Sequence, residues 1–350
     1  MLPIADYDYH LPPDLIAQTP AEPRDHSRLL VVHRGSPPGE GLEHRRFYEI
    51  EALLRPGDLL VANQSRVLPA RLYGRKASGG KIEILLLRQV DQTAWEALVR
   101  GKSAPGAVFG FGGEEGGAPK LNATVESVLP SGGRLLRFDQ PVAPLLPELG
   151  VMPLPPYITA PLGDPERYQT VYSAEAGSAA APTAGLHWTP ELIERVRAAG
   201  VEWATVTLHV GLDTFRPVQT DDALAHPMHR EWYELPPATA EAINRARQRG
   251  GRVIAVGTTT VRVLETAGRD QNLEPGAELA AAEGWTDIYI YPPYRFRVVD
   301  SLLTNFHLPK STLLLLVSAL AGRERILAAY DAAISAGYRF FSFGDAMLIN

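Results

Sequence analysis

The chain has 350 residues, 45% of them hydrophobic, and a formal net charge of -6 at pH 7. This length and composition indicate a globular protein of roughly two domains, and the acidic balance restricts any nucleic-acid contact to a local basic patch. Since the chain contains no cysteine, disulfides, thiolate metal sites, iron–sulfur clusters and a cysteine nucleophile are excluded.

The amino-terminal residues 1–8 contain neither the basic start nor the apolar core of a signal peptide. The longest apolar run, residues 313–321, is about half as long as a membrane span requires. We therefore expect a soluble protein of the cytoplasm, and we expect it to be a monomer.

Short alternating or apolar runs separated by glycine-rich turns occupy residues 58–140, and they predict an antiparallel β domain, a small barrel. The glycine-rich stretch 110–117 is expected to be a flexible hairpin. A dinucleotide-binding fingerprint requires glycine where Glu115 stands, and no helix follows it. The predicted strands are residues 58–62, 81–87, 95–99, 121–125 and 134–138.

After a proline-rich connector at residues 141–161, strand and helix signals alternate. Thr189 and Pro190 predict the start of a helix, which Gly200 ends. The later strands are predicted at residues 201–210, 252–256, 287–291 and 338–343, and the later helices at 240–249, after 257, at 311–321 and at 323–336.

Because the first sixty residues also mix strand and helix signals, both chain ends are expected to form one domain. The predicted fold class is α/β: a large mixed α/β domain from residues 1–65 and 150–350, with an inserted small antiparallel β-barrel domain of residues 66–149.

Ligands of α/β sheets collect where strands end and helices begin. Residues 257–262 place three threonine hydroxyls at a helix start, a cradle for a carboxylate, ribose hydroxyls or phosphate, although plain helix capping would need only one threonine. Segments of this kind are residues 181–188 with Thr183, Gly185 and His187; 209–217 with His209 and Gly211; 257–262 with Thr258, Thr259 and Arg262; 304–311 with Asn305, His307 and Lys310; and 344–347 with Asp345.

Histidines stand at three of these junctions, which makes His187, His209 and His307 candidate general bases. For any one of them the alternative is a packed, hydrogen-bonded side chain. The nearest approach to a metal cluster is His226, His229 and Glu231, but a proline interrupts it and no helix spaces the ligands, so no metal site is predicted.

Basic residues are densest at the start of the predicted barrel. They fit phosphate contact and a solvated strand face equally well. A second candidate is the segment 295–297, in which Phe296 stands between two arginines and is available for base stacking. The dense stretch contains Arg66, Arg71, Arg75, Lys76 and Lys81.

Four strings, in this order along the chain, closely resemble the motifs of the S-adenosylmethionine:tRNA ribosyltransferase-isomerase family of queuosine biosynthesis. The chain departs from the family pattern at Asp213, Thr260 and Pro293. Asp213 matters most because it adds a charge beside a candidate ligand loop. The strings are APTAGLH at residues 181–187, HVGL at 209–212, TNFHLPKSTL at 304–313 and GDAMLI at 344–349.

The resemblance implies transfer and isomerisation of the ribosyl moiety of S-adenosylmethionine onto 7-aminomethyl-7-deazaguanine at the wobble position of tRNA. The product would be epoxyqueuosine, and adenine and methionine would be released. S-adenosylmethionine and tRNA are then the partners, and no cofactor is expected because S-adenosylmethionine is consumed as a substrate. The alternatives are a metal-dependent hydrolase and a tRNA-binding module without catalysis.

The mechanism implied by this resemblance begins with a base that forms an ylide at the ribose C5′, and it needs a proton donor for adenine. We assign the base to His187 or His209, the acid or amine partner to Asp345, and substrate anchors to Thr258, Thr259 and Lys310. The rest of the expected substrate site is Thr183, Gly185, Gly211, Arg262, Asn305 and His307, and the expected tRNA contacts are Arg66, Arg71, Arg75 and Lys76.

Overall fold

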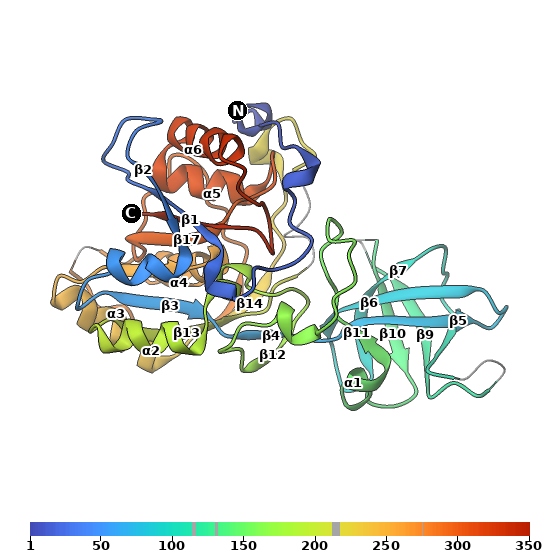
Figure 1. The fold of residues 1–350 in the computed structure, drawn as a ribbon. Coiled ribbons are helices and arrows are strands. Elements are labelled where there is room, and N and C mark those ends of the chain that lie inside the picture. The colour runs from blue at the N-terminus through green and yellow to red at the C-terminus, as the bar shows by residue number, and fades with distance from the viewer. Residues whose placement is uncertain (114–116, 130–131, 212–217, 275) are drawn as a thin grey trace. The chain divides into compact units, whose positions relative to one another are not determined.

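The computed structural model describes residues 1–113, 117–129, 132–211, 218–274 and 276–350. The chain forms two compact units (Figure 1). One unit contains Met1–Arg66, Pro155–Glu175 and Ala181–Asn350, and the other contains Val67–Leu154 and Ala176–Ala180. Two short strands, β4 (Ser65–Val67) and β12 (Glu175–Ser178), pair with each other where the chain passes between the units.

The first unit is built on a nine-stranded mixed sheet with the order β16-β14-β13-β3-β15-β17-β18-β1-β2. Its centre, from β13 to β17, is parallel, and the two middle strands, β3 and β15, are almost entirely apolar, as burial on both faces requires. The strands are β1 (Arg28–Val32), β2 (Leu42–Arg46), β3 (Leu59–Asn63), β13 (Glu202–Leu208), β14 (Glu231–Leu235), β15 (Val253–Val256), β16 (Ala282–Thr286), β17 (Ser301–Asn305) and β18 (Ala346–Ile349).

Helices pack on this sheet, and Figure 1 shows α2 alongside β3 and β13, with α5 and α6 grouped beside β1 and β17. Thr189 caps α2 by accepting a hydrogen bond from the Leu192 amide at 3.2 Å, and the apolar face of α2 joins one core with strands β1, β3 and β15. The helices are α2 (Pro190–Ala198), α3 (Pro237–Gln248), α4 (Thr258–Asp270), α5 (Thr312–Ala321) and α6 (Arg323–Ser335).

The second unit is a barrel of six antiparallel strands that closes through the β5–β8 pairing. Gly74 stands at this seam, where a Cβ atom would lie 2.4 Å from the carbonyl oxygen of Gly110. The strands are β5 (Arg71–Lys76), β6 (Lys81–Gln89), β7 (Ala94–Arg100), β8 (Val108–Phe111), β9 (Leu121–Val128) and β10 (Arg134–Phe138); β11 (Gly150–Val151) pairs with β5, and α1 (Leu146–Leu149) precedes it.

The predicted fold class, a mixed α/β domain with an inserted antiparallel barrel, is confirmed by this architecture. Within the described residues, none of the helices has the length and apolarity that crossing a membrane would need.

One predicted strand was assigned to the wrong unit, and two others lie elsewhere along the chain. The strand predicted at residues 58–62 is present as β3, but β3 is a central strand of the large sheet, with parallel neighbours on both sides, and is not part of the barrel. The strand predicted at 287–291 lies instead at β16, and the Thr286 hydroxyl accepts the Ile288 amide where the strand ends. The strand predicted at 338–343 is displaced to β18, because Phe341 has φ of 68° and cannot extend a strand.

Candidate active site

The carboxyl ends of β13, β3, β15 and β17 meet at one edge of the large sheet, the edge at which α/β sheets bind ligands. A pocket lies there, and segments far apart in the sequence meet in its wall. It is lined by residues 181–184, 257–259 and 304–308 together with Tyr157, Val210, Ser311, Leu313, Phe341 and Ser342.

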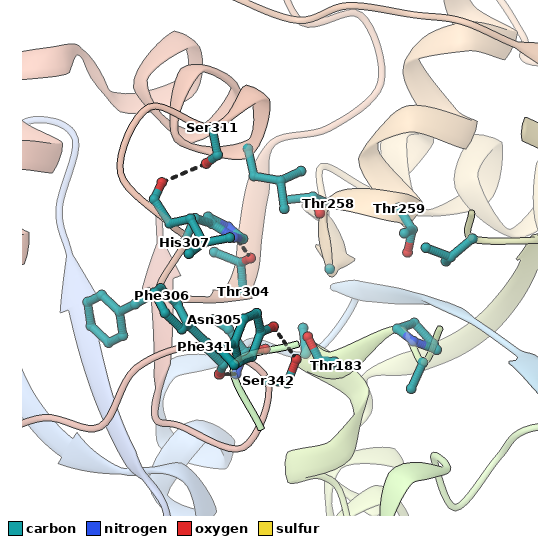
Figure 2. A pocket seen from close by; sticks show the side chains of 18 residues that line it. Thr183, Thr258, Thr259, Thr304, Asn305, Phe306, His307, Ser311, Phe341 and Ser342 are labelled. Carbon is teal, nitrogen blue, oxygen red and sulfur yellow. Dashed lines mark hydrogen bonds between the residues drawn. The ribbon is translucent and has the colours of Figure 1, made fainter. Parts of the chain in front are cut away.

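The pocket is small and uncharged. Its volume of about 60 Å³ gives room for about four to six water molecules, the size of a ribose ring. Of the described residues that line it, none is Asp, Glu, Lys or Arg. Figure 2 shows Thr258 and Thr259 on one side of the site and His307 with Thr304 on the other. A cationic group of a ligand bound here would therefore meet no carboxylate of this described lining to neutralise its charge.

Helix α4 begins at the pocket. Its first residues, Thr258 and Thr259, line the cavity, and the amides of a first helical turn have no partner within the helix. Thr260 differs, since its hydroxyl donates to the Val256 carbonyl at 2.8 Å and is fully buried. Two of the three predicted threonines therefore line the cavity, and the hydroxyl of the third is bonded to strand β15.

Asn63, at the end of β3, ties these elements together. Its side-chain Nδ2 donates to the Leu208 carbonyl at 3.0 Å and to Thr259 Oγ1 at 3.3 Å, while its Oδ1 accepts the Ser65 and Leu208 amides. Asn63 was not expected from the sequence, although its place at the carboxyl end of a strand was the available signal.

Among the described residues that line the pocket, His307 is the one with an imidazole side chain. Its Nε2 lies 3.0 Å from Thr304 Oγ1, and within the described part of the chain its Nδ1 has no hydrogen-bond partner. Burial lowers the pKa of His307 to about 3, so the ring is neutral at pH 7. If Nε2–H donates to Thr304, the Nδ1 lone pair is available to accept a proton.

His187 lies behind the pocket and is not among its lining residues. Its Nε2 accepts from Asn305 Nδ2 at 3.1 Å, so Nδ1–H donates to Ser27 Oγ at 2.7 Å. The ring also stacks on Phe47, and burial lowers its pKa to about 3. With both nitrogens occupied, the ring is arranged to orient Asn305, which also donates to the Phe341 carbonyl at 3.1 Å.

Asp345 and Lys310 also have protein partners. The buried Asp345 carboxylate accepts the Arg28 and Arg339 amides, each at 2.8 Å, and so joins the start of β1 to the turn before β18. Lys310 forms an ion pair with Asp8 at 2.8 Å. Neither residue lines the pocket.

A buried ion pair supports the neighbouring wall. Arg262 pairs with Glu231, whose second carboxylate oxygen accepts the Gly211 amide at 2.7 Å. Burial lowers the pKa of Arg262 to about 10. Arg262 and Gly211 therefore hold the chain beside Val210, which lines the pocket, and they do not line it themselves. The departure at Asp213 lies outside the described residues.

His209, between β13 and Val210, is half-buried and lies outside the lining. Among the described residues its Nδ1 has no hydrogen-bond partner. Burial lowers its pKa, and the nearby Glu175 opposes that shift.

The 3-10 helix Thr183–His187 supplies one wall. Thr183 lines the pocket, whereas Gly185 is required by packing: a Cβ there would lie 2.1 Å from the Tyr172 hydroxyl. Packing in the core behind the pocket therefore explains why position 185 is glycine. The expected contact between Gly185 and substrate stays a prediction.

Three lining residues were not expected from the sequence. Tyr157 comes from the segment interpreted as a connector, and its hydroxyl lies 2.7 Å from Ser342 Oγ. Phe341 adjoins Ser342 in the pocket wall. Burial raises the pKa of Tyr157 above its ordinary value, which keeps the phenol protonated. Tyr157 stands in an irregular segment, which carries no periodic signal, and residues 341 and 342 were expected inside a strand.

The expected tRNA contacts have different surroundings. Arg66 pairs with Glu166, and Arg71 lies 3.6 Å from Glu83. Lys76 donates to the Lys102 carbonyl at 3.0 Å, and together with Arg75 and Lys81 it lines an open groove on the barrel.

A metal site at His226, His229 and Glu231 would need the Glu231 carboxylate as its acidic ligand. That carboxylate instead binds Arg262 and the Gly211 amide. In the described ranges, no three histidine, aspartate or glutamate side chains are grouped so that they could hold a metal ion.

Comparison with known proteins gives one consistent result. Residues 4–349 match the model of the family described as "Queuosine biosynthesis protein". The chain is similar to the S-adenosylmethionine:tRNA ribosyltransferase-isomerases of Moorella thermoacetica, at 55% identity, and Symbiobacterium thermophilum, at 56%, each over 99% of both chains. It also resembles the crystal structure of the S-adenosylmethionine tRNA ribosyltransferase from Thermotoga maritima, at 42% identity and a TM-score of 0.56, over 99% of this chain and 100% of that one.

Proposed function

The chain belongs to the queuosine biosynthesis protein family, and we propose that it carries out the reaction of its relatives at the pocket beside α4. It is an S-adenosylmethionine:tRNA ribosyltransferase-isomerase. The enzyme transfers and isomerises the ribosyl moiety of S-adenosylmethionine onto 7-aminomethyl-7-deazaguanine at the wobble position of tRNA. Epoxyqueuosine forms, and adenine and methionine leave.

One observation supports the choice of pocket above all others. Three of the four family-like strings, at residues 181–187, 209–212 and 304–313, contribute to the same wall although they lie far apart in the sequence. The fourth leads into β18, next to β17. With its volume of about 60 Å³, the pocket suits the ribose, and the remainder of S-adenosylmethionine and the tRNA then lie outside it.

The uncharged lining suits the first chemical step. The sulfonium acidifies the ribose C5′ hydrogens, and a positive charge stabilises the adjacent carbanion most where no counter-ion and little water compensate it. We propose that His307 Nδ1 accepts the C5′ proton. The electron pair left on C5′ expels the ring oxygen, which opens the sugar. The bond between the sugar and adenine then breaks, and its electrons leave with adenine.

Adenine needs a proton as it leaves. We propose that Tyr157 supplies it, because this phenol lines the pocket and its hydroxyl lies 2.7 Å from Ser342 Oγ. At neutral pH Tyr157 is protonated and His307 is neutral, so one pocket holds both a proton donor and a proton acceptor. The aminomethyl nitrogen of the tRNA base then attacks the sugar, and epoxide closure releases methionine.

The other expected residues take supporting roles in this proposal. Thr183, Thr258 and Thr259 line the pocket and anchor the substrate, with the α4 amides as further donors. His187 orients Asn305, and Asp345 fixes the turn before β18. Gly211 and Arg262 hold the wall at Val210. Lys310 stays a predicted anchor, and His209 is the alternative base.

The tRNA reaches the protein as a polyanion, so we propose phosphate contacts at the barrel groove lined by Arg75 and Lys76. Arg66 and Arg71 lie next to the carboxylates of Glu166 and Glu83, so they contribute less to tRNA binding than Arg75 and Lys76. Because its substrate is tRNA, we place the enzyme in the cytoplasm; the monomeric state stays a prediction.

Replacement of Thr258 by valine is expected to raise the Kd for S-adenosylmethionine about five- to tenfold, since one hydrogen bond contributes about 1 kcal/mol. The matched control is Thr260→Val, which removes a hydroxyl that donates to the Val256 carbonyl of β15 and should leave this Kd unchanged. Calorimetric titration of both variants gives the two constants. Equal losses in both would contradict an anchoring role for the α4 start.

A further inference from the structure

Three aromatic rings form a row from the pocket wall to the edge of the large sheet. His209 follows β13, Trp232 lies on β14 and Trp285 on the edge strand β16. The rings of His209 and Trp232 are stacked, with centroids 5.4 Å apart and planes 21° apart. Trp232 stands directly opposite Trp285 in the antiparallel pairing, so their side chains share one face of the sheet.

This row is accessible to solvent. The exposed fraction of Trp285 is 45%, and Trp232 and His209 are half-buried. Their neighbours on the opposite face, Leu208 and Tyr233, are buried, as the alternation of side chains along strands requires. Because the three rings lie next to one another on one accessible face of the sheet, they form a contiguous patch, and such patches mark interaction surfaces.

The row begins next to the proposed active site, because His209 immediately precedes Val210, which lines the pocket. A pocket of this size admits the reacting sugar, so a nucleotide must approach from outside and its unpaired neighbours come to rest on the adjacent surface. Aromatic side chains across a sheet are a recurrent platform for unpaired RNA bases.

We propose that His209, Trp232 and Trp285 stack unpaired bases of the tRNA next to the nucleotide being modified. This inference rests on the proposed function, and it gives His209 a stacking role in place of proton transfer. Two residues farther from the pocket edge, Glu234 and Glu283 stand opposite each other. Their carboxylates repel phosphate, so the RNA backbone keeps to the pocket side of the row.

The test is steady-state kinetics with tRNA that carries the 7-aminomethyl-7-deazaguanine precursor. Trp285→Ala should raise the KM for tRNA about fivefold to a hundredfold, the loss of one base–aromatic stack, and leave the KM for S-adenosylmethionine and kcat unchanged. Trp285→Phe should retain most of the affinity. Tyr48→Ala is the matched control, because Tyr48 is 40% exposed in the same unit but lies outside the row.

Tryptophan fluorescence provides a second measurement that a merely structural role would not affect. Adding the tRNA should quench the fluorescence of the wild-type chain, and Trp285→Phe should lose part of that quenching. An unchanged KM for tRNA in Trp285→Ala, or equal rises in the KM values for tRNA and S-adenosylmethionine, would contradict the stacking of tRNA bases on this row. A wild-type chain that neither binds the tRNA nor turns over would instead overturn the proposed function.

Discussion

Replacing His307 by glutamine is expected to lower kcat by about a hundredfold to ten-thousandfold, the usual contribution of a positioned general base. Glutamine keeps a polar group beside Thr304 but cannot accept and hold the proton. Hydrogen exchange from deuterated solvent into the C5′ position of S-adenosylmethionine measures the step directly. It should disappear in His307→Gln.

The same exchange measured in His209→Gln and His187→Gln separates the three histidines. Each should retain exchange, because His209 lies outside the lining and both His187 nitrogens are hydrogen-bonded. If exchange survives in His307→Gln and vanishes in His209→Gln, the general base is His209 and not His307.

The pH dependence has a defined sign. A base must be unprotonated to act, so kcat falls only as the pH drops through its pKa. Because burial lowers the pKa of His307 to about 3, kcat should show no inflection near the ordinary histidine value of about 6.5.

Replacing Arg262 by leucine is expected to lower the free energy of unfolding by about 3 to 5 kcal/mol, because it leaves the Glu231 carboxylate buried without its counter-ion. The pair is buried on both sides, with side-chain exposures of 8% and 5%. Urea unfolding followed by circular dichroism measures the change.

Two variants control this measurement. Arg245→Leu breaks a surface pair with Glu202 and should cost less than about 1 kcal/mol. The double variant Arg262→Leu/Glu231→Leu removes both charges and should recover most of the loss, leaving the Gly211 amide without its acceptor. Equal costs for Arg262→Leu and Arg245→Leu would contradict a structural role for the buried pair.

The sequence revealed the junctions of this site more readily than the roles of their residues. Strand ends and helix starts follow from hydrophobic period and capping residues, so the segments containing Thr183, Thr258, Asn305 and His307 were identified in advance. The structure places these four residues in the lining of one pocket. Whether each contacts substrate stays a prediction.

The partners of each polar group lie far away in the chain and could not be inferred. Ser27 and His187 are 160 positions apart, and Arg28 and Asp345 are 317 apart. These contacts turn two expected catalytic groups toward the protein interior. Tyr157 was missed for the related reason that an irregular, proline-rich segment has no period from which the direction of a side chain can be inferred.

The decisive measurement is adenine release when the purified chain is incubated with S-adenosylmethionine and tRNA bearing the 7-aminomethyl-7-deazaguanine precursor. We expect adenine, methionine and epoxyqueuosine-containing tRNA in equal amounts, with no loss of activity when a chelator is present. Binding of the tRNA without adenine release would instead identify a binding module, and release that a chelator abolishes would identify a metal-dependent enzyme. Either result would contradict the proposed reaction at this uncharged pocket.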